Sequence, residues 1–280
     1  MMAPVSITAP LVLNVIDLVR QAGAAILPHW RQGVAVRQKS DDSPVTAADL
    51  AAHRVLADGL ARLTPDVPVL SEEACDIPFA ARSAWDVWWV VDPLDGTKEF
   101  IDGSEEFTVN VALVERGQVI FGVVGIPTRD VCFSGGRELG AFRIQGEDGI
   151  EIGVRVQPED AFTVVASRRH GSPAQQRLVD GLGDTFGEPK LVSVGSSLKF
   201  CLLAEGLADF YPRLAPTSQW DTAAAQGVLE GAGGEVVTLD GQPLTYEMRE
   251  SFLNPHFLAL PREAAWRQQV LELAGSLGDA

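Results

Sequence analysis

Two carboxylates, Asp92 and Asp95, stand three residues apart at the end of the apolar run 88–91. That run predicts a strand buried on both faces, in the middle of a sheet. Pro93 removes a backbone donor, so the chain is expected to leave the ladder after Asp92, and Gly96 then lets backbone approach a ligand closely. The segment is therefore either a polar strand-to-loop turn or a divalent-metal site beside a phosphate cradle, since carboxylate oxygens suit Mg²⁺ and free N–H groups suit an anion.

Acidic residues elsewhere in the chain could complete such a metal site. Glu72 and Glu73 follow a short predicted strand, although on their own they would be interpreted as a solvated turn. Asp221 stands at the start of a helix predicted over 222–230, where it is either the N-cap or a further ligand. Both interpretations stay open from these residues alone.

Asp49 has a competing structural explanation. It lies three residues after Thr46 at the start of a helix that ends before Pro65, and this spacing is typical of a capping box. An acidic residue in the first turn also interacts favourably with the helix dipole. Helix capping and a role at the site are therefore both open for Asp49.

The elements that must position these residues form one large domain or two tightly joined halves. Residues 1–156 combine two helices with antiparallel strands, including a hairpin closed by Arg116-Gly117-Gln118, and are predicted as an α+β half carrying most of the acidic candidates. Residues 157–280 alternate strands and helices, which predicts an α/β half. Helices are predicted over residues 10–31, 46–63, 173–182, 198–205, 222–230 and 264–277, and strands over 67–70, 88–91, 107–115, 119–126, 131–133, 141–144, 162–166, 192–194, 209–212, 235–239 and 257–260.

Two segments are predicted as loops. Residues 32–44 are polar and could reach over a site, or could be an ordinary solvated loop. Residues 74–86 have the irregular pattern of a variable surface loop.

Basic and hydroxyl side chains gather after three strands of the second half. Ser167 and His170 follow one strand, Ser196 and Lys199 follow the next, and Arg213 stands just beyond a third. In a chain whose formal charge is −16, this contrast leaves anion contact and an ordinary loop as open alternatives. His170 alone would be interpreted as a surface histidine.

Composition excludes several classes of function and site. With 22 basic and 38 acidic residues, the chain lacks the clustered positive charge of a nucleic-acid-binding surface, so no nucleic-acid polymer is expected as a partner. Three widely spaced cysteines argue against a disulfide framework and a thiolate zinc site, and favour a reducing compartment such as the cytoplasm. Asp17 and Arg20 interrupt the apolar N-terminal run, which is predicted as an amphipathic helix with no membrane span or signal core.

Three motifs in one order carry a resemblance. They are Glu72-Glu73, then Asp92-Pro93-Leu94-Asp95-Gly96-Thr97, then Trp220-Asp221-Thr222-Ala223-Ala224 running to Ala232-Gly233-Gly234. The ordered set resembles the inositol monophosphatase superfamily of Mg²⁺-dependent, lithium-sensitive phosphomonoesterases. Within it, residues 95–100, 195–201 and 211–213 are similar to the bacterial 3'(2'),5'-bisphosphate nucleotidase branch, whose role lies in sulfur metabolism. The resemblance covers most of residues 10–260, continues through Glu250-Ser251-Phe252-Leu253-Asn254-Pro255, and departs mainly in 74–86 and the glycine-rich end of the first half.

The resemblance implies a fold and a reaction. The fold would be a layered αβαβα sandwich, with an antiparallel sheet in the first half and a smaller mixed sheet with helices in the second. The reaction would be phosphomonoester hydrolysis by water activated with about two or three Mg²⁺ ions per site. The implied metal ligands are Glu72, Asp92, the Leu94 carbonyl, Asp95 and Asp221. Thr97 and Glu72 would steer the proton of the attacking water, and Asp49 would restrain Thr97.

The resemblance also implies a substrate. The N–H groups of Gly96 and Thr97 would bind the phosphoryl oxygens. The side chains implied to contact a nucleotide bisphosphate are Ser167, His170, Ser196, Lys199, Arg213 and Asp221. The expected substrate is adenosine 3',5'-bisphosphate, with the 3'-phospho sulfate donor as a second.

Alternatives stay open at this point. The chain could be an inositol phosphate or fructose bisphosphate phosphatase, or a non-catalytic sensor of metal and nucleotide. Peripheral association with the inner membrane and the choice between monomer and homodimer are also open.

Overall fold

The computed structural model describes residues 5–32, 37–38, 44–166 and 173–276. Its helices are α1 (Ala9–Ile26), α2 (Ala47–Leu63), α3 (Phe79–Arg82), α4 (Thr97–Ile101), α5 (Pro173–Phe186), α6 (Leu198–Ala204), α7 (Ala223–Gly231) and α8 (Arg267–Gly275), with 3₁₀ turns η1 (Leu27–His29), η2 (Glu72–Ala74), η3 (Pro127–Arg129) and η4 (Gln219–Asp221). Its strands are β1 (Arg37–Gln38), β2 (Pro44–Val45), β3 (Val69–Ser71), β4 (Val87–Asp95), β5 (Thr108–Glu115), β6 (Gln118–Ile126), β7 (Val131–Gly136), β8 (Gly140–Gln145), β9 (Asp148–Glu151), β10 (Thr163–Ala166), β11 (Lys190–Ser193), β12 (Tyr211–Arg213), β13 (Gly234–Thr238) and β14 (Phe257–Pro261).

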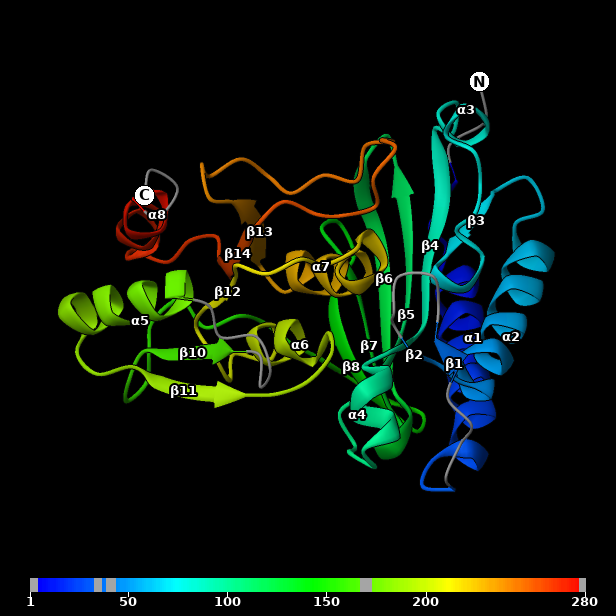
Figure 1. Cartoon of the computed structure of the whole chain (residues 1–280), viewed down its shortest axis with the longest axis horizontal. Coiled ribbons are helices and arrows are strands. Elements are labelled where there is room, and N and C mark those ends of the chain that lie inside the picture. Colours follow the sequence, from blue (N-terminus) through cyan, green and yellow to red (C-terminus); the bar gives the residue numbers. More distant parts are fainter. Residues whose placement is uncertain (1–4, 33–36, 39–43, 167–172, 277–280) are drawn as a thin grey trace.

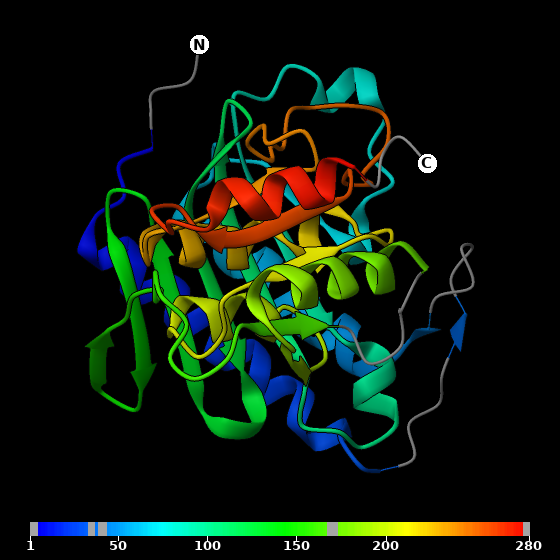
Figure 2. The ribbon, with the colours of Figure 1, turned by 90° about the vertical axis from the view of Figure 1, so that its left-hand side faces the viewer.

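Five layers follow one another across the molecule. Figure 1 shows α1 and α2 on one face of the large sheet and α6 and α7 on its other face, then the smaller sheet, then α5 and α8. Figure 2, turned by 90°, shows α8 and α5 as the outer layer in front of the smaller sheet. The predicted αβαβα sandwich is confirmed.

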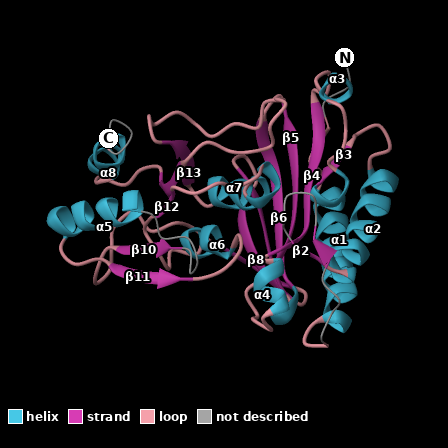
Figure 3. Cartoon of the chain, in the orientation of Figure 1, coloured by secondary structure: helices cyan, strands magenta, loops and turns pink. Residues whose placement is uncertain are grey.

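In the described part of the chain, seven strands form the large sheet in the order β3-β4-β5-β6-β7-β8-β9. Figure 3 shows these strands as one layer between helices. All neighbours are antiparallel except β3 and β4, which are parallel. Trp88 and Val90 face α7, while Trp89 and Val91 face α1 and α2. The prediction that residues 88–91 form a strand buried on both faces is confirmed.

The end of β4 differs from the prediction. The chain was expected to leave the ladder after Asp92, yet the ladder only breaks there: Asp92 pairs with Asn110, and Asp95 pairs again with Thr108 across an irregularity. Pro93 has no N–H to donate, and the Leu94 N–H donates to Asp92 Oδ1 at 3.0 Å. The strand therefore carries both carboxylates, and the irregularity between Asp92 and Asp95 alters the direction in which the backbone presents their side chains.

Two further segments correct the predictions. Strand β9 was not expected, because all four of its residues are exposed and show no apolar alternation. Within 74–86, predicted as a surface loop, lies helix α3, whose Arg82 is only 3% exposed. The predicted hairpin is confirmed, with Arg116 and Gly117 at φ 49° and 77°, which suits a two-residue turn.

The smaller sheet joins two groups of strands. Strands β10 and β11 are parallel, strands β12, β14 and β13 are antiparallel, and a parallel bridge between Val164 and Phe210 links the groups. The predicted mixed sheet of the second half is confirmed. The division of the chain near residue 156 stays a prediction.

Helix α1 begins with a hydrogen bond from the Leu11 N–H to the Thr8 hydroxyl and buries Val15, Val19 and Ala22 against the large sheet. By length and composition the segment Ala9–His29 would be sufficient to cross a membrane, the one such helix found in the described residues, but core helices of folded proteins pass the same test. Its packing agrees with the predicted amphipathic helix.

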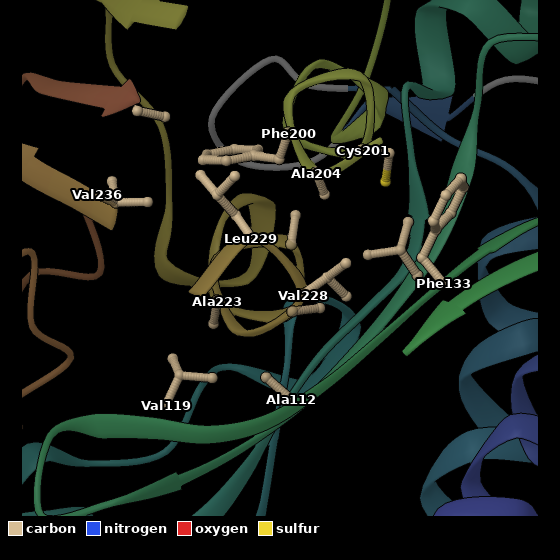
Figure 4. Packing of buried hydrophobic residues seen from close by; sticks show 14 of the residues in the cluster. Ala112, Val119, Phe133, Phe200, Cys201, Ala204, Ala223, Val228, Leu229 and Val236 are labelled. Atoms are coloured by element: carbon tan, nitrogen blue, oxygen red, sulfur yellow. The ribbon is translucent and has the colours of Figure 1, made fainter. Parts of the chain in front are cut away.

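Helix α7 lies unusually close to the large sheet because glycines face each other at the contact. A Cβ on Gly122 of β6 would lie 2.1 Å from the carbonyl oxygen of Ala224, and one on Gly231 would lie 2.3 Å from that of Gly140. Figure 4 shows Ala223, Val228 and Leu229 of this helix among the side chains of the core. The small residues at this contact therefore bring the first turn of α7, which follows Asp221, against the sheet.

We expect Gly122→Ala to push α7 away from β6, because backbone atoms fill the space that the methyl group needs. The free energy of unfolding should fall by about 1–3 kcal/mol, and the loss should be accompanied by lower activity as Asp221 moves. Urea unfolding followed by tryptophan fluorescence measures the first effect. Gly149→Ala on β9 is the control, since its Cβ would meet only Ile144 at 3.9 Å; equal losses in both variants would contradict the packing argument.

Candidate active site

Four carboxylates from three parts of the chain converge at the end of β4. Asp92 and Asp95 belong to that strand, and Asp92 is only 1% exposed. Because β3 pairs in parallel with β4 and Ser71 lies opposite Val91, Glu72 follows beside Asp92, with which it shares a hydrogen bond. Asp221 reaches the same place from η4. The structure thus brings together the acidic side chains that the sequence singled out.

The electrostatics of this cluster are unfavourable to four bare anions. Burial raises the pKa of Asp92 well above its ordinary value, and the charges of Glu72, Asp95 and Asp221 raise it further. Burial also raises the pKa of Asp221 to about 8, with Asp95 and Glu72 adding to the effect. The pKa of Asp95 is raised to about 6 by burial, against the opposing influence of Lys199 and the Ser197 N–H. Carboxylates gathered in this way need either protons or a cation.

Three of the carboxylates are oriented by backbone N–H groups. Asp92 Oδ1 accepts from Leu94, Asp95 Oδ2 accepts from Ser197 at 2.6 Å, and Asp221 Oδ2 accepts from Ser218 at 2.9 Å. As they stand, no three acidic, histidine or cysteine side chains of the described residues are arranged to hold an ion. The hard oxygens and the mutual repulsion nevertheless suit Mg²⁺. The ligand set implied by the resemblance stays a prediction.

Asp49 makes the contacts that both interpretations require, and its role at the site stays a prediction. Its Oδ2 accepts from the Thr46 N–H at 2.8 Å and the Thr46 hydroxyl at 2.7 Å, which completes the capping box of α2. Its Oδ1 lies 3.3 Å from the Thr97 hydroxyl, which can donate to it or to the Leu94 carbonyl at 3.2 Å. Burial raises the pKa of Asp49, and its hydrogen bonds with Thr46 oppose this. One carboxylate therefore caps a helix and restrains Thr97.

The alternative that Asp221 is the N-cap of α7 is wrong in detail. Thr222 stands between Asp221 and the helix, and Asp221 is the last residue of η4, where its side chain forms a capping box with Ser218. The carboxylate thus accepts from the Ser218 N–H and interacts with the charges of Asp95 and Glu72.

Gly96 makes the turn between β4 and α4. Its φ of 91° is left-handed, and a Cβ there would lie 3.1 Å from the Glu106 carbonyl oxygen. A glycine is required for both reasons. The turn places the N–H groups of Gly96 and Thr97 at the start of α4, and their role as phosphoryl donors stays a prediction.

A cavity beside the carboxylates is lined by five of the predicted substrate contacts, Gly96, Ser196, Lys199, Arg213 and Asp221. Its lining includes Asp95, Gly96, Lys98, Glu99, Gly195, Ser196, Lys199, Phe200, Tyr211, Arg213, Thr217, Asp221 and Thr222. Ser196, Lys199 and Arg213 are therefore brought together with Asp95 and Asp221. Ser167 and His170 lie outside the described residues.

Lys199 and its neighbours give this cavity a positive side. Burial lowers the pKa of Lys199 to about 8, although Asp95 opposes this, and its Nζ donates to the carbonyls of Ser196 at 2.5 Å and Val194 at 3.4 Å. Ser196 has a left-handed φ of 48°. The buried Ser196 Oγ and Arg213 Nε have no hydrogen-bond partner among the described residues. Such groups suit an anionic ligand.

Sequence reasoning missed several residues around this cavity. Tyr211, nearly fully buried, lies with its ring 5.6 Å from the Lys199 Nζ. The Ser197 hydroxyl lies 2.8 Å from Asn110 Oδ1, to which it donates, and 2.8 Å from the Thr108 hydroxyl. These hydrogen bonds fix the loop before α6 to β5. Tyr211 stands two residues before Arg213 and could have been found from that motif, whereas Asn110 gives no local signal.

Comparison with known proteins gives consistent results. The family model for the inositol monophosphatase family matches residues 9–272. The 3'(2'),5'-bisphosphate nucleotidase CysQ of Escherichia coli (strain K12) is 48% identical over 247 residues, 87% of this chain and 97% of that protein. CysQ of Aggregatibacter actinomycetemcomitans is 34% identical over 262 residues, 93% and 96% of the two chains.

Solved structures agree in fold. CysQ from Bacteroides thetaiotaomicron, described as a bacterial member of the inositol monophosphatase family, superposes with a TM-score of 0.80 at 35% identity, covering 92% of this chain and 99% of that one. The Thermotoga maritima IMPase superposes with a TM-score of 0.75 at 23% identity over 97% and 99% of the two chains, which shows a common fold.

Addition of Mg²⁺ should raise the midpoint of thermal unfolding, and more so at about pH 8 than at about pH 5. The ordinary pKa of both Asp95 and Asp221 is 3.8, and burial raises these values to about 6 and about 8. The folded chain therefore binds these protons more tightly than the unfolded chain, so metal-free stability falls as pH rises from about 4 to about 8. Mg²⁺ should offset that loss.

Differential scanning fluorimetry across this pH range, with and without Mg²⁺, measures the effect. Asp221→Asn is the matched control and should show a smaller response to Mg²⁺. A response of equal size at both ends of the pH range would contradict the expectation.

Proposed function

The chain belongs to the inositol monophosphatase family, and on that premise we propose that it hydrolyses the 3'-phosphate of adenosine 3',5'-bisphosphate, giving AMP and phosphate. The observation that carries the proposal is one cavity with two sides, where buried carboxylates face Lys199 and Arg213. The identity to CysQ nucleotidases supports the choice of substrate. The 3'-phosphoadenylyl sulfate donor is proposed as a second substrate.

The residues present suit Mg²⁺. The groups that would hold it are Glu72, Asp92, the Leu94 carbonyl, Asp95 and Asp221, because buried, mutually repelling carboxylates bind a hard cation well. When bound, about two or three Mg²⁺ ions would supply charge neutralisation and lower the pKa of a water molecule.

Thr97 and Glu72 orient the attacking water in this proposal. The Thr97 hydroxyl is held between Asp49 Oδ1 and the Leu94 carbonyl, so its position is fixed before substrate binds. Glu72 lies beside Asp92 and near Asp49, where it can accept a proton from water. Asp49 acts through Thr97 and keeps the start of α2 in place.

The N–H groups of Gly96 and Thr97 bind the oxygens of the phosphoryl group. They lie at the turn between β4 and α4, beside the carboxylates, because Gly96 adopts a left-handed conformation. N–H groups fixed in this way stabilise charge without reorganising during the reaction. Asp221 contacts the ribose oxygen from which the phosphoryl group departs.

The positive side of the cavity binds the second phosphate. The Lys199 ammonium donates to the Ser196 carbonyl, with Asp95, Glu99 and Asp221 as the acidic side chains around it. The Ser196 hydroxyl and Arg213 Nε are buried without partners in the described residues. A 5'-phosphate would satisfy all three. Ser167 and His170 are proposed contacts to ribose or adenine.

Other substrates of the family are the near alternatives. Inositol 1-phosphate and fructose 1,6-bisphosphate would use the same carboxylates, and the cavity lining of Lys98 with Gly195 to Lys199 favours the nucleotide. A non-catalytic sensor of metal and nucleotide would need no water-orienting pair, so the contact between Thr97 and Asp49 speaks against it.

A cytoplasmic location is proposed from the cysteines. Cys75, Cys132 and Cys201 are joined by no disulfide in the described structure, and such cysteines are typical of a reducing compartment. Peripheral membrane association and the choice between monomer and homodimer stay open.

Phosphate release from four esters tests the proposal. We expect Mg²⁺-dependent hydrolysis of adenosine 3',5'-bisphosphate to exceed that of inositol 1-phosphate, which has no second phosphate for the positive side of the cavity. It should also exceed that of fructose 1,6-bisphosphate, which has a second phosphate but no adenosine. Adenosine 3'-monophosphate, which lacks the 5'-phosphate, should have a lower kcat/KM. Preference for the inositol ester would exclude the nucleotidase, and no turnover of any ester would exclude a phosphatase.

Asp95→Asn should abolish turnover while preserving the fold. The amide keeps an oxygen that can accept from the Ser197 N–H but carries no charge for a cation. Circular dichroism and phosphate release together check this. Retention of more than about a tenth of the activity, a barrier change under about 1.4 kcal/mol, would argue against the assigned role.

A further inference from the structure

The segment 249–254 contains most of a motif that the sequence analysis noted, yet none of its residues lines the cavity. It runs beside residues 217–219, just before Asp221, and Ser218 forms an antiparallel bridge with Leu253. The Gln219 N–H donates to the Phe252 carbonyl at 2.9 Å, and the Asn254 N–H donates to the Thr217 carbonyl at 2.8 Å. The segment is therefore paired with the stretch that leads into η4.

Asn254 adds side-chain bonds on both sides of Asp221. It is 8% exposed, and its Nδ2 donates to the Ser218 carbonyl at 2.8 Å and to the Thr222 hydroxyl at 2.9 Å. Thr217 Oγ1 lies somewhat further away, at 3.2 Å. Two amide protons suffice for the two shorter bonds. One side chain thus ties together the residues before and after the metal-ligand candidate.

The Thr222 hydroxyl is held from a second direction. Its oxygen lies 2.9 Å from the hydroxyl of the fully buried Tyr246, which also lies 2.8 Å from Gln226 Oε1. Gln226 Nε2 in turn donates to Glu230 Oε1 and the Leu244 carbonyl, each at 3.0 Å. This chain of hydrogen bonds runs along α7 and fixes Thr222 to the body of the fold.

The turn needs such an anchor because repulsion acts on it. Asp95 and Glu72 oppose the negative charge of Asp221, so a turn free to move would carry that carboxylate away from them. Gln219 lies in the same turn but does not anchor it. Its side chain is 1% exposed, and neither of its polar atoms has a hydrogen-bond partner in the described residues. The side-chain bonds of Asn254 thus hold the turn in place.

We propose that Asn254 is a positioning residue for Asp221: by tying Ser218 to Thr222 it sets where the Asp221 carboxylate stands and hence how tightly the site binds Mg²⁺. The inference rests on the proposed function in one respect, that Asp221 is a metal ligand. Partners that orient metal ligands typically change metal affinity 10–100-fold when removed.

Two variants and one control test the proposal. Asn254→Ala removes the amide, and Asn254→Leu removes it while filling the space. Arg82→Met is the control, because Arg82 is buried and holds the other end of the segment by donating to the Arg249 and Glu250 carbonyls at 2.5 and 2.8 Å. In the described structure Arg82 makes no hydrogen bond to residues 217–222 and is linked to them only indirectly, through the Phe252 ring, whose centroid lies 4.4 Å from the Arg82 Cζ. Arg82→Met should therefore lower the stability of the fold without changing how tightly the site binds Mg²⁺.

The readout is the Mg²⁺ concentration at half-maximal effect, measured by thermal shift without substrate and by phosphate release. Both Asn254 variants should need at least about tenfold more Mg²⁺ than the wild type, and activity should recover largely at saturating Mg²⁺. Arg82→Met should lower the unfolding midpoint and leave the Mg²⁺ requirement unchanged.

Three results would overturn the proposal. The first is a lowered unfolding temperature in Asn254→Ala with an unchanged Mg²⁺ requirement. The second is a wild-type Mg²⁺ requirement in Asn254→Leu. The third is a Mg²⁺ requirement that rises in Arg82→Met as much as in the Asn254 variants. The thermal shift separates the role of Asn254 in Mg²⁺ binding from the proposed hydrolysis of the nucleotide, because it needs no substrate. A wild-type protein that binds Mg²⁺ but hydrolyses none of the esters would refute the proposed function alone, whereas one that shows no response to Mg²⁺ would refute both.

Discussion

Mutual repulsion among buried carboxylates is the constraint on which this structure depends. Glu72, Asp92, Asp95 and Asp221 lie together at the end of β4, and burial raises the pKa of the three aspartates. A fold that relaxed freely would separate them or expose them to water. It keeps them together because two lie on one strand, a third follows the neighbouring parallel strand, and the fourth sits on a turn tied down by hydrogen bonds.

Close packing is what allows the fourth carboxylate to come from so far along the chain. Strand β4 and η4 are separated by more than a hundred residues in the sequence. Glycines at the contact between α7 and the large sheet leave no side chain in the way, so the helix and the turn before it lie directly against the strands. The same helix also packs against the smaller sheet through residues such as Val236 (Figure 4). One helix therefore holds both sheets and delivers a carboxylate to the site.

The site could be predicted from the sequence where the signal is local. The apolar run before Asp92 indicates a strand buried on both faces, and the spacing of Thr46 and Asp49 indicates the cap. The pairing that puts Glu72 beside Asp92 depends on strand register, which no local pattern contains. Arg82 looked like a surface residue because its partners are backbone carbonyls from residues 249 and 250, and carbonyls leave no mark in a sequence. The family resemblance supplied Asp221, but the part Asn254 plays became apparent only from the geometry.

An acidic protein that binds an anion needs its positive charge confined to one place. The chain carries a formal charge of −16, yet Lys199 lies buried next to Asp95, with its charge facing carbonyl oxygens and the cavity. Burial lowers the pKa of this lysine to about 8, because its charged form loses contact with water there. A phosphate group at that position would favour the charged form, because opposite charges at short range stabilise each other more strongly where water is excluded. Under the proposed function, a cation would therefore neutralise the carboxylates at one end of the cavity, and the phosphate would stabilise the protonated lysine at the other.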